Sequence, residues 1–231
     1  MNTEVALIVG AGKGLSASLA KRFAREGMRV ALAARNEEKI KPLAAEINAT
    51  TFTCDAGEPD QVARLFEDVS AKFGAPTLVV FNAGMRGRGA IAELDPEQVK
   101  RGWIAGAFGG FLVGQQAAKR MLPLQRGTIL FTGATASVKG FAGSAPFSMA
   151  KFSLRGLAQS MARELAPKGI HVAHIVIDGG IATSYADDEA DRATDRWLDP
   201  DAIAESYLQL HRQQRSAWTW ELEVRPWLEK F

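Results

Sequence analysis

The chain has 231 residues, of which 47% are hydrophobic and 23% charged, and its formal net charge is +2. This length and composition are typical of one globular α/β domain with a sizeable core. Basic and acidic residues are mixed along the chain, so no basic block predicts binding to nucleic acid or to an anionic membrane. The single cysteine, Cys54, excludes an internal disulfide and favours a reducing compartment. Without a signal-peptide pattern or an apolar run of membrane-spanning length, we expect a cytoplasmic protein.

The chain opens with an apolar run that meets a glycine-rich turn. Residues 5–9 are apolar without alternation, which predicts a strand covered on both faces. Three glycines follow within residues 10–14, and a helical pattern extends over residues 15–26. A strand, a glycine turn and a helix N-terminus together form an anion site, and its usual occupant is a dinucleotide pyrophosphate. Because the spacing Gly10-x-x-x-Gly14-x-Ser16 is looser than the strict motif, a glycine-rich loop without a ligand is the alternative.

Strand-like and helix-like segments then alternate with short connections. We predict strands over residues 28–34, 50–54, 78–81, 128–132 and 170–177, and helices over residues 36–47, 59–73, 95–121 and 145–165. Asn36 and Asp95 are the expected N-caps, and a proline follows Asp95 at the first helical position. Repeated β-α units predict right-handed crossovers and a doubly wound parallel sheet, with helices on both faces.

The last third of the chain departs from this alternation. The polar and acidic residues 184–199 predict a lid over the substrate. A last helix begins at Pro200, and residues 221–224 could form a short edge strand. We expect one domain over residues 1–231, in which residues 200–231 form a C-terminal helix and tail.

Five short segments together resemble the short-chain dehydrogenase/reductase superfamily. They cover nearly the whole chain from residue 4 to residue 183. They are the glycine turn, Cys54-Asp55, Asn82-Ala83-Gly84, Lys151 on the long helix and Asp178-Gly179-Gly180-Ile181-Ala182-Thr183. The resemblance implies a Rossmann-like α/β fold, a nicotinamide dinucleotide cofactor and a small-molecule substrate.

The cofactor half of the family pattern is present. The resemblance implies that Asp55 contacts the adenine, that residues 82–84 lie under the adenosine ribose, and that Thr183 holds the nicotinamide amide. A turn carboxylate for Asp55 and a strand-end hydrogen bond for Asn82 are the alternatives, and Asp178 stands where the family usually has proline. The expected cofactor-binding residues are Gly10, Gly12, Lys13, Gly14, Leu15, Ser16, Arg35, Asp55, Ala56, Asn82, Ala83, Gly84, Lys151, Gly179, Ile181 and Thr183.

The end of the second predicted strand bears on which cofactor is bound. An acidic residue there would bind the ribose hydroxyls and repel a 2′-phosphate. This chain has Ala34-Arg35 instead, and Lys13 adds a second cation in the glycine turn. We therefore expect NADP(H) in preference to NAD(H), with two solvated surface charges as the alternative.

The catalytic group that the resemblance implies is incomplete. Members usually carry Asn, Ser, Tyr and Lys, with the tyrosine four residues before the lysine on one helix face. Lys151 is kept, but Phe147 stands at the tyrosine position, Ala134 at the serine position and Ala107 at the asparagine position. A phenyl ring cannot transfer the proton that accompanies hydride transfer, and such acid–base help is worth roughly 10² to 10⁴ in rate. Ordinary carbonyl reduction is therefore not expected, and an exposed helix lysine is the alternative for Lys151.

Other candidate groups are few. Tyr185, in the predicted lid, could cover the nicotinamide or pack at the surface. His171 and His174 lie near the start of the sixth strand, away from the end where ligands bind, which predicts structural roles. Cys54 is expected to be an inert buried thiol, and no cluster has metal-ligand spacing.

The sequence leaves two functions open and suggests self-association. The first function is an NADP(H)-dependent oxidoreductase with an altered site, one version of which reduces a polarised C=C bond, as some enoyl-thioester reductases of this superfamily do. The second is a non-catalytic NADP(H)-binding sensor or partner subunit. A homodimer or homotetramer is expected from small residues that would admit a second helix and from aromatic residues of the tail, namely Gly106, Gly109, Gly110, Gly114, Trp218, Trp220 and Trp227.

Overall fold

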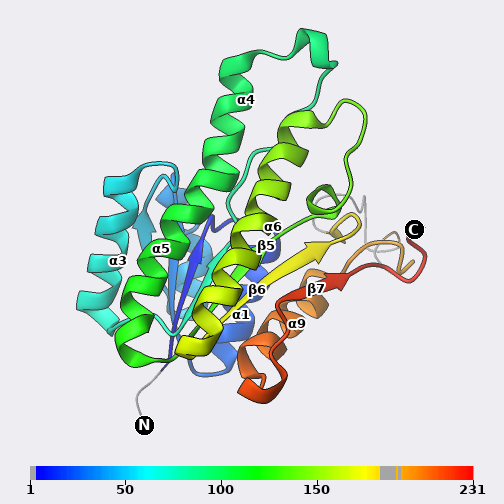
Figure 1. Cartoon of the computed structure of the whole chain (residues 1–231). Helices are drawn as coiled ribbons and strands as arrows, with labels where there is room; N and C mark the ends of the chain where they lie inside the picture. Colours follow the sequence, from blue (N-terminus) through cyan, green and yellow to red (C-terminus); the bar gives the residue numbers. More distant parts are fainter. Residues whose placement is uncertain (1–3, 183–190, 192–193, 231) are drawn as a thin grey trace.

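A sheet of seven parallel strands forms the middle layer of the molecule (Figure 1). The computed structural model describes residues 4–182, 191 and 194–230. The strands are ordered β3-β2-β1-β4-β5-β6-β7, and each neighbouring pair is parallel. Their bounds are β1 Val5–Val9, β2 Arg29–Ala34, β3 Thr50–Thr53, β4 Leu78–Phe81, β5 Gly127–Thr132, β6 Ile170–Ile177 and β7 Glu221–Val224. The predicted doubly wound sheet is confirmed, and so is the short edge strand.

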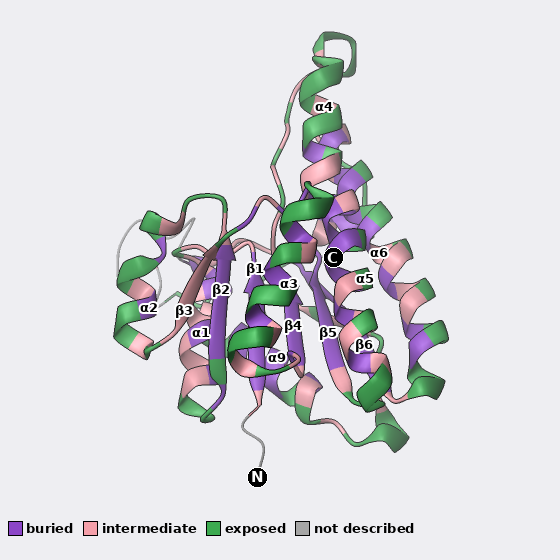
Figure 2. Cartoon of the chain, turned by 90° about the vertical axis from the view of Figure 1, so that its left-hand side faces the viewer, coloured by how far each residue is buried: buried purple, intermediate pink, exposed green. Residues whose placement is uncertain are grey.

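Helices cover both faces of this sheet, and their outward sides are exposed (Figure 2). One face packs against α3 (Pro59–Phe73), α5 (Gly109–Met121) and α6 (Ala145–Leu165). The other packs against α1 (Leu15–Arg25), α2 (Lys41–Ile47) and α9 (Pro200–Arg212). Helix α4 (Pro96–Trp103) projects beyond the carboxyl edge of the sheet.

The first strand shows why its sequence lacks alternation. All five residues of β1 are buried. Val5, Leu7 and Val9 belong to the core on the α3, α5 and α6 side, whereas Ala6 and Ile8 belong to the opposite core. Because successive side chains of a strand point to opposite faces, a strand covered on both sides must be apolar throughout.

Proline and aspartate mark several helix starts. The Asp95 carboxylate accepts a hydrogen bond from the Glu97 N–H at 3.0 Å, which confirms the predicted cap. The prediction for Asn36 was wrong, because it precedes a single 3₁₀ turn and caps no N–H with its side chain. Pro42 explains the difference, since a proline cannot donate to the preceding turn and a helix therefore begins only at Lys41.

The helix predicted over residues 95–121 is interrupted. A π-helical segment, Ile104–Phe108, separates α4 from α5. The glycines around it were expected to face a second molecule, but they face the chain's own core. A Cβ atom on Gly110 would lie 2.4 Å from Leu154 Cδ1, and one on Gly114 would lie 2.9 Å from Met161 Sδ. These glycines admit α6 and the sheet, so they give no support to the expected dimer or tetramer.

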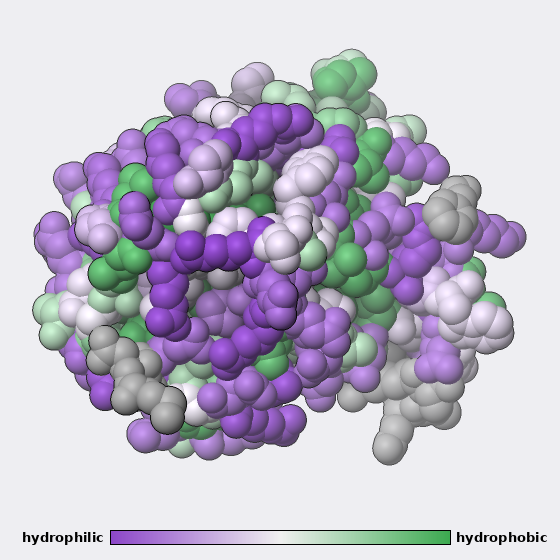
Figure 3. All heavy atoms as spheres, turned by 60° about the horizontal axis from the view of Figure 1, so that its bottom comes forward, coloured by the Kyte–Doolittle hydropathy of each residue, from purple (hydrophilic) through white to green (hydrophobic). Residues whose placement is uncertain are grey.

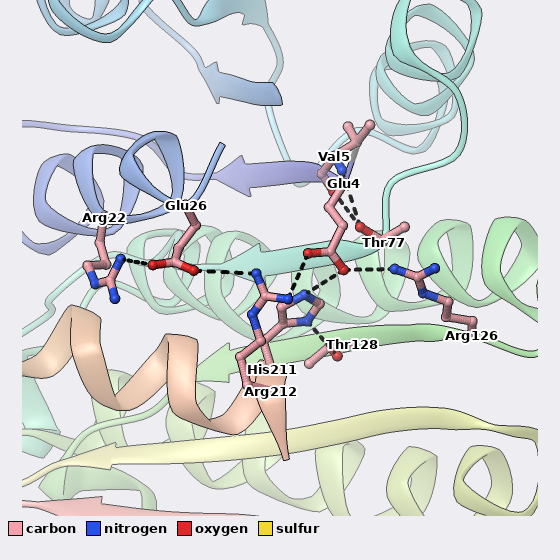
Figure 4. Close-up of polar contacts among 9 residues, drawn as sticks. All are labelled: Glu4, Val5, Arg22, Glu26, Thr77, Arg126, Thr128, His211 and Arg212. Carbon is pink, nitrogen blue, oxygen red and sulfur yellow. Dashed lines mark hydrogen bonds and ion pairs between the residues drawn. The ribbon is translucent and has the colours of Figure 1, made fainter. Parts of the chain in front are cut away.

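A polar network closes the edge of the sheet where the strands begin (Figure 4). The Glu4 carboxylate accepts a hydrogen bond from Arg126 at 2.8 Å and lies 3.3 Å from nitrogens of His211 and Arg212. Burial alone would raise the pKa of Glu4, but the neighbouring His211, Arg126 and Arg212 together hold it below its usual value. Figure 3 shows this face of the molecule, hollowed and framed by hydrophilic residues.

A second network fixes the edge strand β7. Arg155 of α6 donates to both carboxylate oxygens of Glu221, at 2.6 and 2.7 Å. Glu221 also lies 3.1 Å from Nδ1 of His174, whose side chain is fully buried on β6. Trp218 stacks on His171 with ring centroids 4.9 Å apart. His171 and His174 therefore occupy structural positions, as predicted.

No helix among the described residues is long and apolar enough to cross a membrane.

His174 predicts how stability depends on pH. Burial lowers the pKa of His174 to about 4, from 6.5 in the unfolded chain, despite the nearby Glu221 carboxylate. Protonation therefore favours the unfolded state, and stability is lost as pH falls below 6.5. We expect this residue to remove about 1 kcal/mol of unfolding free energy between pH 7 and pH 5.5.

The measurement is urea denaturation of the parent protein and of His174→Gln at both pH values. The other two histidines are unchanged in the variant, so the difference between the two proteins isolates His174. The variant should lose about 1 kcal/mol less than the parent. An identical loss in both proteins would contradict the assignment.

Candidate functional site

Two adjoining cavities lie along the carboxyl ends of the strands. The first, of about 590 Å³, is bordered by the glycine turn and the ends of β2 and β3. The second, of about 690 Å³, is bordered by the loop after β4, the end of β5, the start of α6 and the end of β6. Asn82, Ala83 and Gly84 line both, so the two cavities form one elongated cleft. The cleft passes the junction of β1 and β4, where the strand order reverses and ligands of such sheets bind.

The glycine turn is packed directly against the end of β4. Gly10 has φ +87°, and a Cβ atom there would lie 2.4 Å from the Ala83 nitrogen. Ser16 Oγ donates to the Gly10 carbonyl at 3.1 Å, and Asn82 Nδ2 donates to that same Oγ at 2.7 Å. Gly14 precedes α1, so no side chain caps the first N–H groups of this helix. Uncapped N–H groups and the helix dipole favour an anion at this point.

The first cavity gathers positive charge. Lys13 and Arg35, two of the predicted cofactor-binding residues, line it, and both are exposed. Lys39, which was not singled out from the sequence, lines the same cavity four residues after Arg35. Glu37, the nearest acidic residue in sequence, does not line it and accepts hydrogen bonds from the Thr51 and Thr53 hydroxyls.

Asp55 and Ala56 line the first cavity as expected. Asp55 Oδ1 accepts a hydrogen bond from the Gly57 N–H at 3.0 Å, so this carboxylate also shapes its turn. The turn-carboxylate interpretation of Asp55 is therefore confirmed, and its contact with the adenine stays a prediction. Cys54 is buried, and burial together with the Asp55 charge raises the pKa of its thiol to about 11, which keeps it protonated.

Lys151 is the central polar group of the second cavity. Its side chain is only 7% exposed, and Nζ donates a hydrogen bond to the Thr132 carbonyl at 2.7 Å. Burial, and to a lesser extent the charge of Arg86, lowers the pKa of Lys151 to about 8. The Phe147 ring lies one helical turn away, with its centroid 5.8 Å from Nζ, and also lines the cavity. The structure thus brings Lys151 and Phe147 together, and the ring offers no proton.

The two predicted alanine positions differ in their surroundings. Ala134 lines the second cavity, and its N–H donates to the buried Ser137 hydroxyl at 3.1 Å. Thr135 lines the cavity beside it. Ala107 is buried within the π-helical segment and does not line the cavity.

Proton donors are scarce around the second cavity. Of the described residues that line it, none is Asp, Glu, His, Cys or Tyr. Its hydroxyl-bearing residues are Thr132, Thr135 and Ser144, and Thr132 Oγ1 is paired with the buried Tyr207 hydroxyl at 2.8 Å. Burial raises the pKa of Tyr207, which does not line the cavity. Within the described part of the chain, no cluster of His, Cys, Asp and Glu could hold a metal ion.

The far end of the second cavity is formed after β6. Gly179 and Ile181, two of the predicted cofactor-binding residues, line it. Asp178, at the usual proline position, forms an ion pair with Arg225 at 3.0 Å, so this part of the loop is tied to the C-terminal tail. The predictions for Thr183 and Tyr185 lie outside the described residues, as does most of the predicted lid.

Several residues of the cleft were not predicted. Asn36 was predicted as a helix cap and Lys39 was not singled out, yet both line the first cavity. Arg86, Arg88 and Phe141 line the second. The signal was present for the arginines, because they directly follow Asn82-Ala83-Gly84, and segments after parallel strands gather at the ligand edge of the sheet.

Together, the parallel sheet and the glycine turn at its strand reversal define a dinucleotide-binding protein of the Rossmann-like class. The chain belongs to the short-chain dehydrogenase family, whose sequence model, described as short chain dehydrogenase, matches residues 4–193.

Relatives and solved structures agree with this assignment. The human 3-oxoacyl-[acyl-carrier-protein] reductase is 28% identical over 80% of this chain and 78% of its own length. A short-chain dehydrogenase structure from Rhodopseudomonas palustris has a TM-score of 0.85 and 38% identity, over 97% of this chain and 99% of its own. A variant of the actinorhodin polyketide ketoreductase, solved with NADPH, has a TM-score of 0.88 and 28% identity, over 99% of this chain and 98% of its own.

The glycine turn yields a matched pair of variants. Gly10→Ala forces a left-handed φ on alanine and places its Cβ against Ala83, so we expect a loss of about 2 to 4 kcal/mol of unfolding free energy. Gly12→Ala meets nothing within 4 Å and should cost less than about 1 kcal/mol. Chemical denaturation of both variants tests this, and equal losses would show that the Gly10 contact is unimportant.

Proposed function

We propose that the protein is an NADP(H)-dependent oxidoreductase with an altered active site, which reduces a polarised C=C bond. The observation that carries the proposal is the juxtaposition of Lys151 with Phe147 in the cleft at the carboxyl ends of the strands. Family membership supports oxidoreductase chemistry. The missing hydroxyl at Phe147 argues against the usual reduction of a carbonyl.

The described residues fit a phosphorylated nicotinamide dinucleotide. The uncapped N-terminus of α1 suits the pyrophosphate. Lys13, Arg35 and Lys39 line the first cavity, and their charges favour a 2′-phosphate over free ribose hydroxyls. The fold is also shared with proteins solved in complex with NADP or NADPH. These features support NADP(H) as the preferred cofactor.

When bound, the dinucleotide would supply a hydride. Lys151 uses one of its three donors on the Thr132 carbonyl, which leaves the others for the ribose beside the nicotinamide. The hydrogen bond to that carbonyl fixes the direction of the ammonium group. Lys151 therefore positions the cofactor and places a positive charge beside the reacting carbons.

Reduction of a conjugated C=C bond suits a cavity with few acids. Hydride adds to the β-carbon, and the resulting negative charge spreads over the α-carbon and the conjugated oxygen. The α-carbon then takes a proton from water, so no tyrosine need contact the carbonyl at the moment of hydride transfer. The Lys151 charge stabilises the developing anion.

A second candidate function is NADP(H) binding without catalysis, as in a sensor or a partner subunit. The observation that favours it is the shortage of acidic groups among the described residues of the second cavity. The positions of Lys151, Asn82 and the glycine turn serve binding equally well in both proposals.

The cations of the first cavity predict cofactor preference. Arg35→Ala should raise the Kd for NADPH about tenfold, because a charge-assisted contact with the 2′-phosphate is lost. The Kd for NADH should change less than about twofold. Arg64→Ala, at an exposed position on α3, serves as the control. Fluorescence titration provides both constants, and equal effects on the two cofactors would contradict the assignment.

A turnover screen separates the two functions. Stopped-assay measurement of NADPH oxidation with ketones, enones and enoyl thioesters should show activity with one of the conjugated classes and none with ketones. Ketone reduction as rapid as enone reduction would overturn the altered-site proposal. Tight NADPH binding without turnover of any class would favour the non-catalytic function.

A further inference from the structure

Arg86 and Arg88 line the second cavity, and neither lines the first. Resting on the oxidoreductase function above, we propose that they select a substrate with an anionic group, a carboxylate or a phosphate, attached to an apolar body. The cations proposed to bind the 2′-phosphate lie in the first cavity, whereas Arg86 and Arg88 lie at the second cavity, where a substrate would lie.

The loop that carries both arginines is held in place. The Gly89 N–H donates to the Gly143 carbonyl at 3.0 Å, which ties the loop to the segment before α6. A Cβ atom on Gly87 would lie 2.9 Å from Pro146 Cβ, so the loop also lies directly against the first turn of α6. The arginines alternate with these glycines. The loop thus keeps both cationic residues at the wall of the cavity.

The charge around this cavity is one-sided. Among the described residues that line it, Arg86, Arg88 and Lys151 are cationic and no carboxylate is present. Lys151 is buried and donates to the Thr132 carbonyl, whereas both arginines are exposed. Guanidinium groups bind carboxylate and phosphate through paired hydrogen bonds, so the arginines are the better anion partners.

The remaining walls are apolar. Met85, Phe141, Phe147 and Ile181 line the same cavity. Lys139 is also exposed, and its Nζ lies 5.5 Å from the centroid of the Phe141 ring, so a further cation lies beside this part of the cavity wall. A substrate with an unsaturated apolar body and one anionic end would match this arrangement.

The position of Arg86 links recognition to chemistry. Its charge contributes to lowering the pKa of Lys151. An anion held by Arg86 would offset that charge and raise the pKa of the lysine. An anionic substrate would therefore keep Lys151 protonated to higher pH than a neutral one would.

The test uses the full-length protein saturated with NADPH and three matched probes. They are benzylideneacetone with a para-carboxylate, its methyl ester, and the analogue with a para-phosphate. The parent should bind one of the two anions at least about tenfold more tightly than the ester, and comparison of the anions identifies the favoured source of charge. Arg88→Gln and Arg86→Gln should each raise KM for that anion about tenfold, which corresponds to about 1.4 kcal/mol.

The same variants should leave KM for the methyl ester within about twofold, and Arg64→Gln should leave all three values unchanged. In the parent, the pH profile for the anion should lie at higher pH than that for the ester, and in Arg86→Gln, which lacks the Arg86 charge, the two profiles should coincide. Equal affinity of the parent for the ester and for both anions would overturn the inference. A tenfold loss of NADPH affinity in Arg86→Gln or Arg88→Gln would overturn it too, because the arginines would then serve the cofactor.

Calorimetry with the same probes separates this inference from the proposed function. Binding of the anions to the NADPH complex is measured without any turnover. A protein that prefers the anions but never oxidises NADPH would refute the oxidoreductase function and retain the recognition site. Turnover of the ester and the anions with equal KM would retain the oxidoreductase function and refute the recognition site.

Discussion

The contact between Gly10 and the backbone of Ala83 is the constraint on which the cleft depends. It places the glycine turn after β1 against the end of β4, so that the two cavities meet at residues 82–84. Ser16 and Asn82 then connect the same two segments by hydrogen bonds. A side chain at Gly10 would separate them. The cleft therefore follows from close backbone packing, and the charged residues around it are placed by that packing.

Much of this arrangement could be predicted from the sequence, for identifiable physical reasons. Apolar runs define buried parallel strands, and prolines at the first helical position define the starts of α3, α4 and α9. The role of Gly110 could not be predicted, because small residues show that something approaches closely but not what it is. Contacts made by loops could not be predicted from the sequence either. Nothing local reveals that Gly87 meets Pro146, or that Lys39 shares a cavity with Arg35.

The second cavity brings the Lys151 ammonium group close to the Phe147 ring. The Thr132 carbonyl holds the Lys151 ammonium, and burial lowers the pKa of that group to about 8. Both features suit the binding of a nucleotide ribose, and neither requires the tyrosine that Phe147 replaces. Exposed arginines line the same cavity. These residues are the basis of the proposed charge recognition and of the proposed hydride chemistry, in which the proton arrives separately.

The proposed combination of a cofactor cleft with an incomplete proton relay is the part of this account that most needs testing. The most direct measurement is ketone-dependent NADPH oxidation by the triple variant Ala107→Asn, Ala134→Ser, Phe147→Tyr, compared with the parent. We predict no ketone reduction by the parent and a gain of at least about 10²-fold over background in the variant, since it restores the acid and its partners. Efficient ketone reduction by the unaltered chain would contradict this view, because the relay would then not be missing.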